Sequence, residues 1–166
     1  MRAKRMFMAT MAAMFVMTGA FQTGSFASNG NGGTRLVAKL APALPVEDFK
    51  GRAVQRVHGI RTVFKAHVEV PLSVLNVPPG DEESISVILN VPRTGMTCTM
   101  VFDEVDTIED VAEYKVFVRK RNTDLLTTNK AGSCTGNISD IIPNDNVVVT
   151  IQGVSTPLTG AFSLKH

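Results

Sequence analysis

The chain has 166 residues, with 17 Lys and Arg against 15 Asp and Glu, so its formal net charge is only +2. This length fits one ordinary domain with a real hydrophobic core. Three of the basic residues and none of the acidic ones lie in the first 27 positions, which leaves 14 against 15 and a net charge of −1 for the remainder. Without a net positive charge, this remainder is not predicted to bind nucleic acid.

Residues 1–27 have the pattern of a signal peptide. Arg2, Lys4 and Arg5 form a positive start, and an uncharged apolar stretch extends from residue 6 to residue 21. Small residues, Ser25 and Ala27, then occupy the positions that a signal peptidase reads. The apolar stretch is shorter than the roughly 20 residues of a membrane-spanning helix. We therefore expect cleavage after Ala27, no membrane span in the mature protein, and a secreted or periplasmic location.

Residues 28–33 are predicted to form a flexible, Gly-rich lead-in, and residues 34–166 a single all-β domain. In chain order, alternating apolar and polar side chains predict strands at 36–40, 53–57, 60–70, 85–91 and 96–102. His58 and Gly59 are predicted to form the tight turn of a hairpin. Pro-containing polar segments separate the other strands.

The second half of the domain continues the pattern with one exception. Residues 107–114 are ambiguous, since the pattern of Thr107 to Asp110 is compatible with the start of a helical turn that has Thr107 as its N-cap. Further strands are predicted at 114–118, 125–128, 133–138, 147–152 and 158–164. About eight to ten short strands without a helical period favour a β-sandwich with Greek-key connections, although a barrel has the same local pattern.

The two cysteines of the chain, Cys98 and Cys134, are predicted to form a disulfide. An even pair in an exported chain is most simply bonded, and Cys98 alternates with apolar residues on a core face. Closing this loop is expected to stabilise the fold by about 4 kcal/mol. The alternative is a pair of thiols with Cys134 as a nucleophile, which we disfavour because no histidine lies near it in the sequence.

Two short motifs resemble other proteins. Leu36-x-Ala38-x-Leu40 followed by Gly51-Arg-Ala53 is similar to the opening of small, mostly uncharacterised exported bacterial domains. Their closing strands are similar to the segment with Pro143, Val147-Val-Val149 and Leu158-Thr-Gly-Ala-Phe162. The resemblance implies a β-sandwich without an assigned activity. No functional residue carries over from it.

The best candidate for a metal site is the acidic run Asp103, Glu104 and Asp106. Calcium prefers several carboxylate and carbonyl oxygens that converge from a flexible loop. The run lacks the Asp-x-Asp-x-Asp-Gly order of the common helix-loop-helix site, so we favour a solvated acidic loop over a calcium site. Calcium is the one cofactor that the sequence raises.

Other reactive patterns are weak. His58, His67 and His166 are interpreted as surface histidines, although the first two approach one another in one register of the hairpin. The chain has no Gly-x-Ser-x-Gly or Ser-x-x-Lys context, and no catalytic residue is predicted. The cluster Arg119-Lys120-Arg121 is able to contact an acidic polymer or a lipid head group, but we favour a role in protecting an edge strand from aggregation.

These observations favour a non-catalytic exported domain that binds or assembles with a protein or glycan of the envelope or extracellular space. The reason is that the sequence predicts a full hydrophobic core and a disulfide but contains no recognisable catalytic motif. One alternative is a secreted hydrolase that uses loop carboxylates, with Asp103, Asp106 and Glu109 as the candidates. A second alternative is a calcium-stabilised, adhesin-like module.

Overall fold

The computed structural model describes residues 33–42, 48–121 and 128–165. The predicted signal peptide, nearly all of the lead-in, most of the strand predicted at 125–128 and His166 lie outside this part of the chain. The described elements are eleven β-strands and three short 3-10 helices, and they include no α-helix. The all-β prediction is confirmed.

The first layer of the fold is built from four long antiparallel strands with a short strand on either side. The long strands are β1 (Thr34–Pro42), β2 (Lys50–His58), β3 (Arg61–Pro71) and β6 (Val111–Arg121). The short strands are β7 (Thr128–Ala131), which pairs with β6, and β11 (Ser163–Leu164), which pairs with β1. The predicted hairpin at residues 53–70 is confirmed. Its tight turn contains Gly59 at a φ of 55°, a conformation that glycine adopts without strain.

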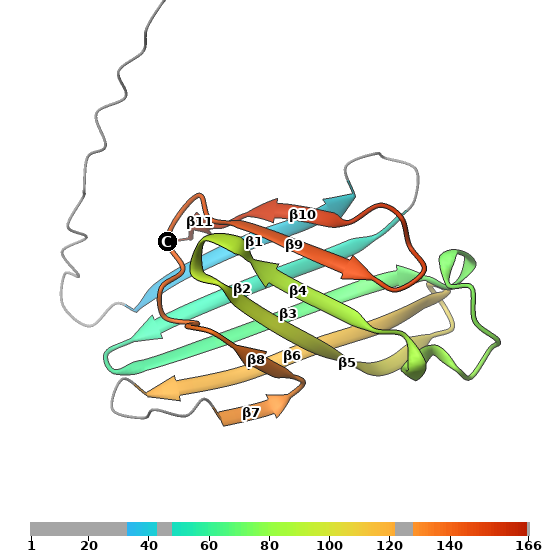
Figure 1. Ribbon diagram of the computed structural model, residues 1–166, viewed down its shortest axis with the longest axis horizontal. Coiled ribbons are helices and arrows are strands. Elements are labelled where there is room, and N and C mark those ends of the chain that lie inside the picture. Colours follow the sequence, from blue (N-terminus) through green and yellow to red (C-terminus); the bar gives the residue numbers. More distant parts are fainter. Residues whose placement is uncertain (1–32, 43–47, 122–127, 166) are drawn as a thin grey trace, which may run out of the picture.

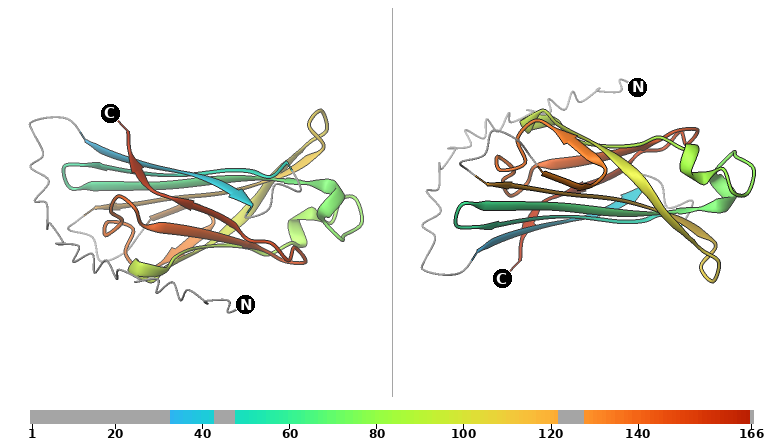
Figure 2. Two further views of the ribbon diagram at one scale, coloured as in Figure 1. Left: turned by 90° about the horizontal axis from the view of Figure 1, so that it is seen from above. Right: turned by 90° about the horizontal axis from the view of Figure 1, so that it is seen from below.

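The second layer faces the first and consists of five antiparallel strands (Figure 2). In spatial order they are β10 (Leu158–Ala161), β9 (Asn146–Ile151), β4 (Val87–Val91), β5 (Met96–Asp106) and β8 (Ser133–Thr135). Short 3-10 helices lie before and between these strands: η1 (Leu72–Val74), η2 (Glu82–Ser84) and η3 (Pro92–Thr94).

The two layers are joined on both sides, so the sheet closes on itself (Figures 1 and 2). β1 pairs with β2 and then with β10, while β5 pairs with β4 and then with β6. Eight strands form the ring, in the order β1-β2-β3-β6-β5-β4-β9-β10. The predicted facing layers are present, but the sheet is a flattened barrel rather than two separate sheets. The periodicity of single strands carries no information on which edges pair, which explains the difference.

Gly160 shows how the ring closes at one corner. A Cβ atom built on this residue of β10 would lie 2.2 Å from the backbone oxygen of Lys39 in β1. Any larger residue would therefore push the two strands apart. The absence of a side chain allows β10 to cross close to β1 at the junction of the layers.

The strand order contains the predicted Greek-key connection. β4, β5 and β6 follow one another as adjacent antiparallel strands, and β3 and β9 flank them on the two sides. The long connection from β3 to β4, through η1 and η2, crosses from one layer to the other. β4, β5 and β6 thus form a three-strand meander, and β3, which the long connection joins to β4, lies beside β6 at the far side of it. This is the order of strands in a Greek key.

The core lies between the layers, where alternate side chains of every ring strand are buried. Tyr114 is fully buried, and its hydroxyl donates a hydrogen bond to the backbone oxygen of Glu82 in η2, at 2.7 Å. Burial and the nearby Glu82 carboxylate raise the pKa of Tyr114 to about 12. Other large core residues are Leu36, Phe64, Val68, Leu89, Met96, Val149, Leu158 and Phe162.

The structure resolves one ambiguous stretch and corrects one predicted strand. Residues 107–110 form a turn without a helix, and the cap is Asp106 rather than Thr107. The Asp106 Oδ1 accepts hydrogen bonds from the backbone N–H groups of Ile108 and Glu109, at 2.8 and 3.2 Å. The strand predicted at 133–138 ends at Thr135. Ile138 is nevertheless fully buried, and its carbonyl accepts a hydrogen bond from the Gln55 side chain.

Candidate functional site

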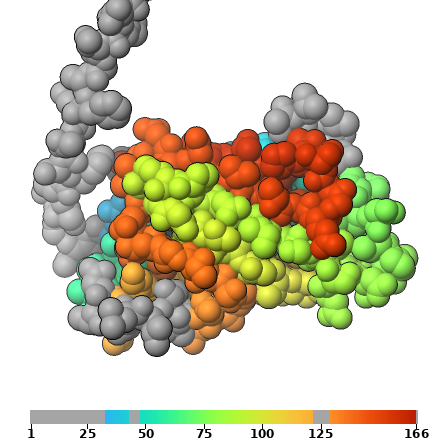
Figure 3. Space-filling model, in the orientation of Figure 1, coloured from blue at the N-terminus to red at the C-terminus, as the bar shows by residue number. Residues whose placement is uncertain are grey.

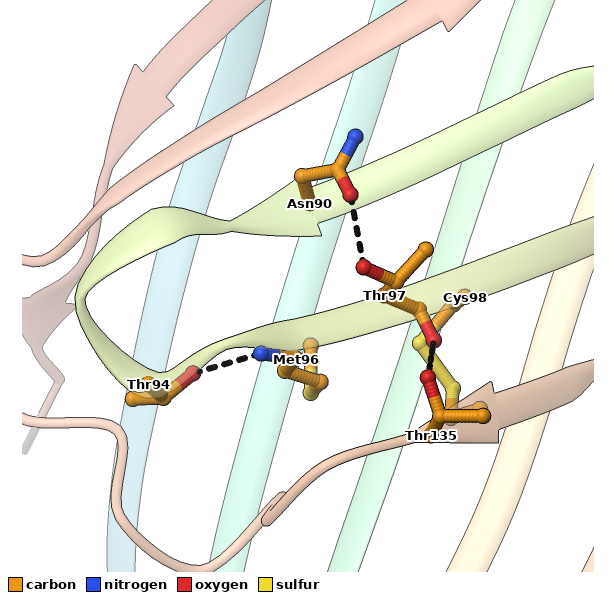
Figure 4. The surroundings of a disulfide bond; sticks show 7 residues. Asn90, Thr94, Met96, Thr97, Cys98 and Thr135 are labelled. Carbon is orange, nitrogen blue, oxygen red and sulfur yellow. Dashed lines mark hydrogen bonds between the residues drawn. A yellow bond between two sulfur atoms is a disulfide. The ribbon is translucent and has the colours of Figure 1, made fainter.

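The predicted disulfide between Cys98 and Cys134 is confirmed. It joins β5 to β8 at directly opposite positions in the second layer (Figure 4). Cys98 is fully buried, as the alternating pattern predicted. Neither cysteine is free, so a nucleophilic Cys134 thiol is wrong for this state of the protein.

A β-bulge in β5 gathers part of the predicted metal site. Phe102 pairs with Tyr114 and Val105 pairs with Ala112, so two residues of β5 stand opposite the single residue Glu113. Carboxylate oxygens of Asp103, Glu104 and Glu113 consequently lie within 4.8 Å of one another. Sequence reasoning missed Glu113, because it lies on the next strand. Asp106 is not part of this cluster. A calcium site here stays an untested alternative to the solvated acidic loop that the sequence favours.

The carboxylates that were considered for a hydrolase are engaged in local contacts. Asp103 forms an ion pair with Lys115, and Glu109 Oε2 lies 2.6 Å from Lys50 Nζ. Asp106 accepts the two backbone hydrogen bonds of its turn. These contacts favour structural roles for the three residues.

The two described histidines lie far apart along the first layer. His58 pairs with Arg61 at one end of the β2–β3 hairpin, whereas His67 pairs with Arg52, six residues further along β2. At about 3.3 Å per residue, this register separates them by about 20 Å. His67 Nε2 lies 2.9 Å from Glu113 Oε2. A site that combines the two histidines is therefore wrong.

The outward side chains of the first layer form what we call the basic face. Antiparallel register places Arg35 opposite Arg56 and Lys39 opposite Arg52, so these positions share one side of the sheet. The same register continues through β3 into β6. Eight cationic residues lie together on this side: Arg35, Lys39, Arg52, Arg56, Arg61, Lys65, Arg119 and Arg121.

No cation of the basic face forms an ion pair with a carboxylate of the described chain. Lys115 is level with Lys39 and Arg52 in the register, and Lys50 lies further toward the other end of the strands, beside Glu69. Both lysines are paired with carboxylates. The Nε of Arg35 is buried and has no hydrogen-bond acceptor among the described residues. One end of the layer is thus neutralised internally, and the other end has an excess of positive charge.

Two shallow hollows lie side by side on the basic face. The first, which we call the Phe117 hollow, has a volume of about 320 Å³ and is lined by Val54, Val63 and Phe117 together with surrounding Arg and Lys side chains. The second, which we call the Lys130 hollow, has a volume of about 540 Å³ and lies between β3, β6 and β7. Val63 and Arg119 line both, so the hollows are continuous.

Phe117 organises the cations around it. Lys65 Nζ lies 4.3 Å from the centre of the ring, and the Arg119 guanidinium carbon lies 4.8 Å from it. Cations at these distances are attracted by the quadrupole of the aromatic ring. This attraction holds two of the positive charges beside the Phe117 hollow instead of leaving them free in solvent.

The outer side of the second layer, which we call the neutral face, has the opposite character. Outward residues of β10, β9, β4, β5 and β8 lie opposite one another in the pairing of these strands, so they share one side of the sheet. Figure 3 shows this face. Up to the point where β5 joins β6, its outward residues are uncharged: Ile88, Asn90, Thr97, Thr99, Ser133, Thr135, Asn146, Val148, Thr150, Thr159 and Ala161. Beyond it, Val101 pairs with Lys115 of β6, and Asp103 is charged.

Sequence reasoning missed the basic face because it averaged charge over the whole chain. Cations four residues apart in β1, β2 and β3 share one side of their strands, and this spacing was the available signal. The interpretation of Arg119-Lys120-Arg121 as protection of an edge strand is wrong, since β6 has a neighbour on both sides. Arg119 and Arg121 belong to the basic face, whereas Lys120 Nζ contacts Asn137 Oδ1 at 3.1 Å.

Comparison of the chain with protein-family models, curated proteins and solved structures finds no match. Within the described part of the chain, no helix has the length and apolar character of a membrane span.

Proposed function

We propose that this protein is an exported, non-catalytic binding module that holds an anionic polymer on its basic face. The observation that supports this most directly is the separation of charge between the two layers. Eight cations without described acidic partners gather on one face, and the other face has none.

Electrostatics favours a ligand that neutralises the cations. Arg35 and Arg56 stand directly opposite one another on neighbouring strands, and like charges in this position destabilise a sheet. A bound polyanion removes this repulsion and releases its own counterions, which is a large source of affinity for such ligands. Six of the eight cations are arginines, whose planar guanidinium group matches the geometry of carboxylate and phosphate.

The dimensions of the face favour a polymer over a small anion. The cations extend over four strands and over about six residues along β2, which corresponds to roughly 15 by 20 Å. One small anion would reach two or three of these side chains. An extended chain with repeated negative charges would reach most of them at once.

An exported location agrees with this function and with the signal-peptide pattern of residues 1–27. The disulfide between Cys98 and Cys134 is of a kind that persists in oxidising compartments. Polymers with carboxylate, sulfate or phosphate groups are the partners that an exported basic surface would meet.

The test is a binding assay with the protein purified after expression of the full chain. Affinities for polygalacturonate, polyphosphate and a single-stranded oligonucleotide are compared with that for uncharged dextran. We expect binding to the polyanions only, with a loss of about a thousandfold between about 50 and 200 mM salt if six or more charges are engaged.

Two triple variants localise the interaction. Arg52→Ala, Arg56→Ala and Arg119→Ala on the basic face should weaken binding at least tenfold, or about 1.4 kcal/mol. Thr97→Ala, Thr99→Ala and Thr150→Ala on the neutral face should leave it unchanged. Absence of binding to every polyanion, or equal affinity of the two variants, would overturn the proposal.

A further inference from the structure

The structure shows, on the basic face, a place for a ring as well as for charges. We infer that the anionic polymer is an acidic polysaccharide, whose uronate-type sugar rings lie in the Phe117 hollow. This inference rests on the proposed function and names the class of ligand for the same face.

The composition of the Phe117 hollow carries the argument. Val54, Val63 and Phe117 line it with apolar surface, and each is only partly buried. A pyranose ring has an apolar C–H face that packs on such a surface. A carboxylate at the edge of the ring would then lie among the surrounding Arg and Lys side chains. A ligand with charge alone would leave the apolar lining exposed to water.

The surroundings of Phe117 disfavour single-stranded nucleic acid as the ligand. Proteins that bind nucleic acid on a sheet face stack successive bases on several aromatic rings. Phe117 is the only Phe, Tyr or Trp among the outward residues of the basic face in the described chain. A single ring cannot supply the series of stacking positions that successive bases use.

The adjoining Lys130 hollow offers a path along which the polymer would continue. It shares Val63 and Arg119 with the Phe117 hollow, and Arg61, Arg121 and Lys130 also line it. A chain whose ring occupies the Phe117 hollow would continue across β3 and β6 toward β7. Its next acidic groups would meet these further cations.

The experiment separates ring recognition from charge recognition. Affinities for polygalacturonate, polyphosphate and oligothymidylate are measured at equal concentration of charge. Phe117→Ala removes the aromatic ring, and Val54→Thr makes the lining polar at almost unchanged shape. Val148→Ala, at an outward apolar position of β9 on the neutral face, is the matched control, and thermal melting confirms that each variant is folded.

We expect polygalacturonate to bind more tightly than the other two polymers. Its affinity should fall about tenfold in Phe117→Ala, as expected for the loss of about 50 Å² of apolar contact, and less in Val54→Thr. Polyphosphate affinity should stay within about twofold in both variants, because their charge is unchanged.

Other outcomes overturn the inference without ambiguity. If polyphosphate binds as tightly as polygalacturonate and Phe117→Ala affects neither, the face recognises charge alone, and only the proposed function stands. If oligothymidylate binds most tightly and loses affinity in Phe117→Ala, the ligand is a nucleic acid. If no polymer binds, the proposed function fails together with the inference.

Discussion

The basic face and the neutral face are built from the same kind of strand but differ in almost every outward residue. Both face solvent on one side and bury alternate side chains in one shared core. The basic face has mostly arginine and lysine at its outward positions, interrupted by valine, phenylalanine and histidine, and Glu69 and Glu113 follow toward the end near Lys50. The neutral face has mostly threonine, serine, valine and asparagine. The core therefore does not account for the difference.

This contrast separates what folding needs from what an external partner would need. The neutral face satisfies strand propensity with β-branched residues and requires nothing further. The basic face retains like charges on neighbouring strands, an arrangement that is unfavourable for the isolated protein. Such a cost is typical of surfaces shaped by a ligand. If this is so, substitutions in the second layer should change stability without changing affinity, and substitutions on the basic face should change affinity.

The largest expected effect on stability belongs to the second layer. Cys98→Ala combined with Cys134→Ala should lower the free energy of unfolding by about 4 kcal/mol, because the bond closes a long loop in the unfolded chain. Urea denaturation measures this loss, and reductant should affect the wild type but not the double variant. Polyanion affinity should be unchanged below the unfolding transition. Loss of binding by the folded double variant would contradict the division between layers.

Charge reversal should have the largest effect on binding. Arg52→Glu, Arg56→Glu and Arg119→Glu together should weaken polyanion binding more than about a hundredfold, or about 3 kcal/mol. Thr97→Glu, Thr150→Glu and Thr159→Glu on the neutral face add three negative charges without removing a cation, and they should weaken it less than about threefold, since salt screens charges over about 10 Å. Equilibrium titration at about 0.1 M salt gives both values. Similar losses in the two variants would show that net charge, and not the face, decides affinity.

Tyr114 belongs to neither face, because its side chain is buried in the core that the two layers share. Its pKa is raised to about 12, first by burial and then by Glu82, so the folded state holds the proton more tightly than the unfolded state. This contribution is complete below about pH 10 and is lost as the pH rises from about 10 to about 12, by about 2 to 3 kcal/mol.

Urea denaturation of the wild type and of Tyr114→Phe between pH 9 and pH 12, as an approximate working range, measures this loss. Tyr114→Phe should show a smaller decline over the same range, because phenylalanine does not titrate. Equal slopes for the two proteins would show that the Tyr114 hydroxyl does not govern alkaline stability.

The smallest expected effect is a gain in stability on the basic face. Arg56→Glu places a carboxylate opposite Arg35 and should raise the free energy of unfolding by about 0.5 kcal/mol, as for an exposed cross-strand pair. The same variant should bind polyanions more weakly. Arg56→Gln, which removes the repulsion without adding a pair, should lie between the two. A loss of stability in Arg56→Glu would show that Arg56 has a structural role.

The sequence predicted the strands best where one side of the strand is buried. Alternation at residues 60–70 and 96–102 identified β3 and β5, and it placed Cys98 in the core. Prediction failed where contacts between distant residues decide the structure. Ser133 to Ile138 has apolar content, but Ile138 leaves the strand, and its carbonyl bonds with Gln55 of β2.

The candidate sites show the same limit. Asp103 and Glu104 were recognised as an acidic run, but their neighbour Glu113 comes from the next strand through a bulge that shifts the register. Arg119 and Arg121 were recognised as a cluster, while their partners on β1, β2 and β3 were counted only in the total charge. Residues that are far apart in the chain carry no local signal of their proximity.

The sequence by itself determined the all-β class, the positions of most strands and the pairing of its two cysteines, because these depend on side-chain periodicity and on having one possible partner. Only the tertiary structure decided that the layers close into a ring and that the cations of four strands share one face. Both outcomes depend on which edges pair and in which register. Backbone hydrogen bonds form between any two strands of similar pattern, so the choice of partner and register depends on how the buried sides pack together in the whole fold.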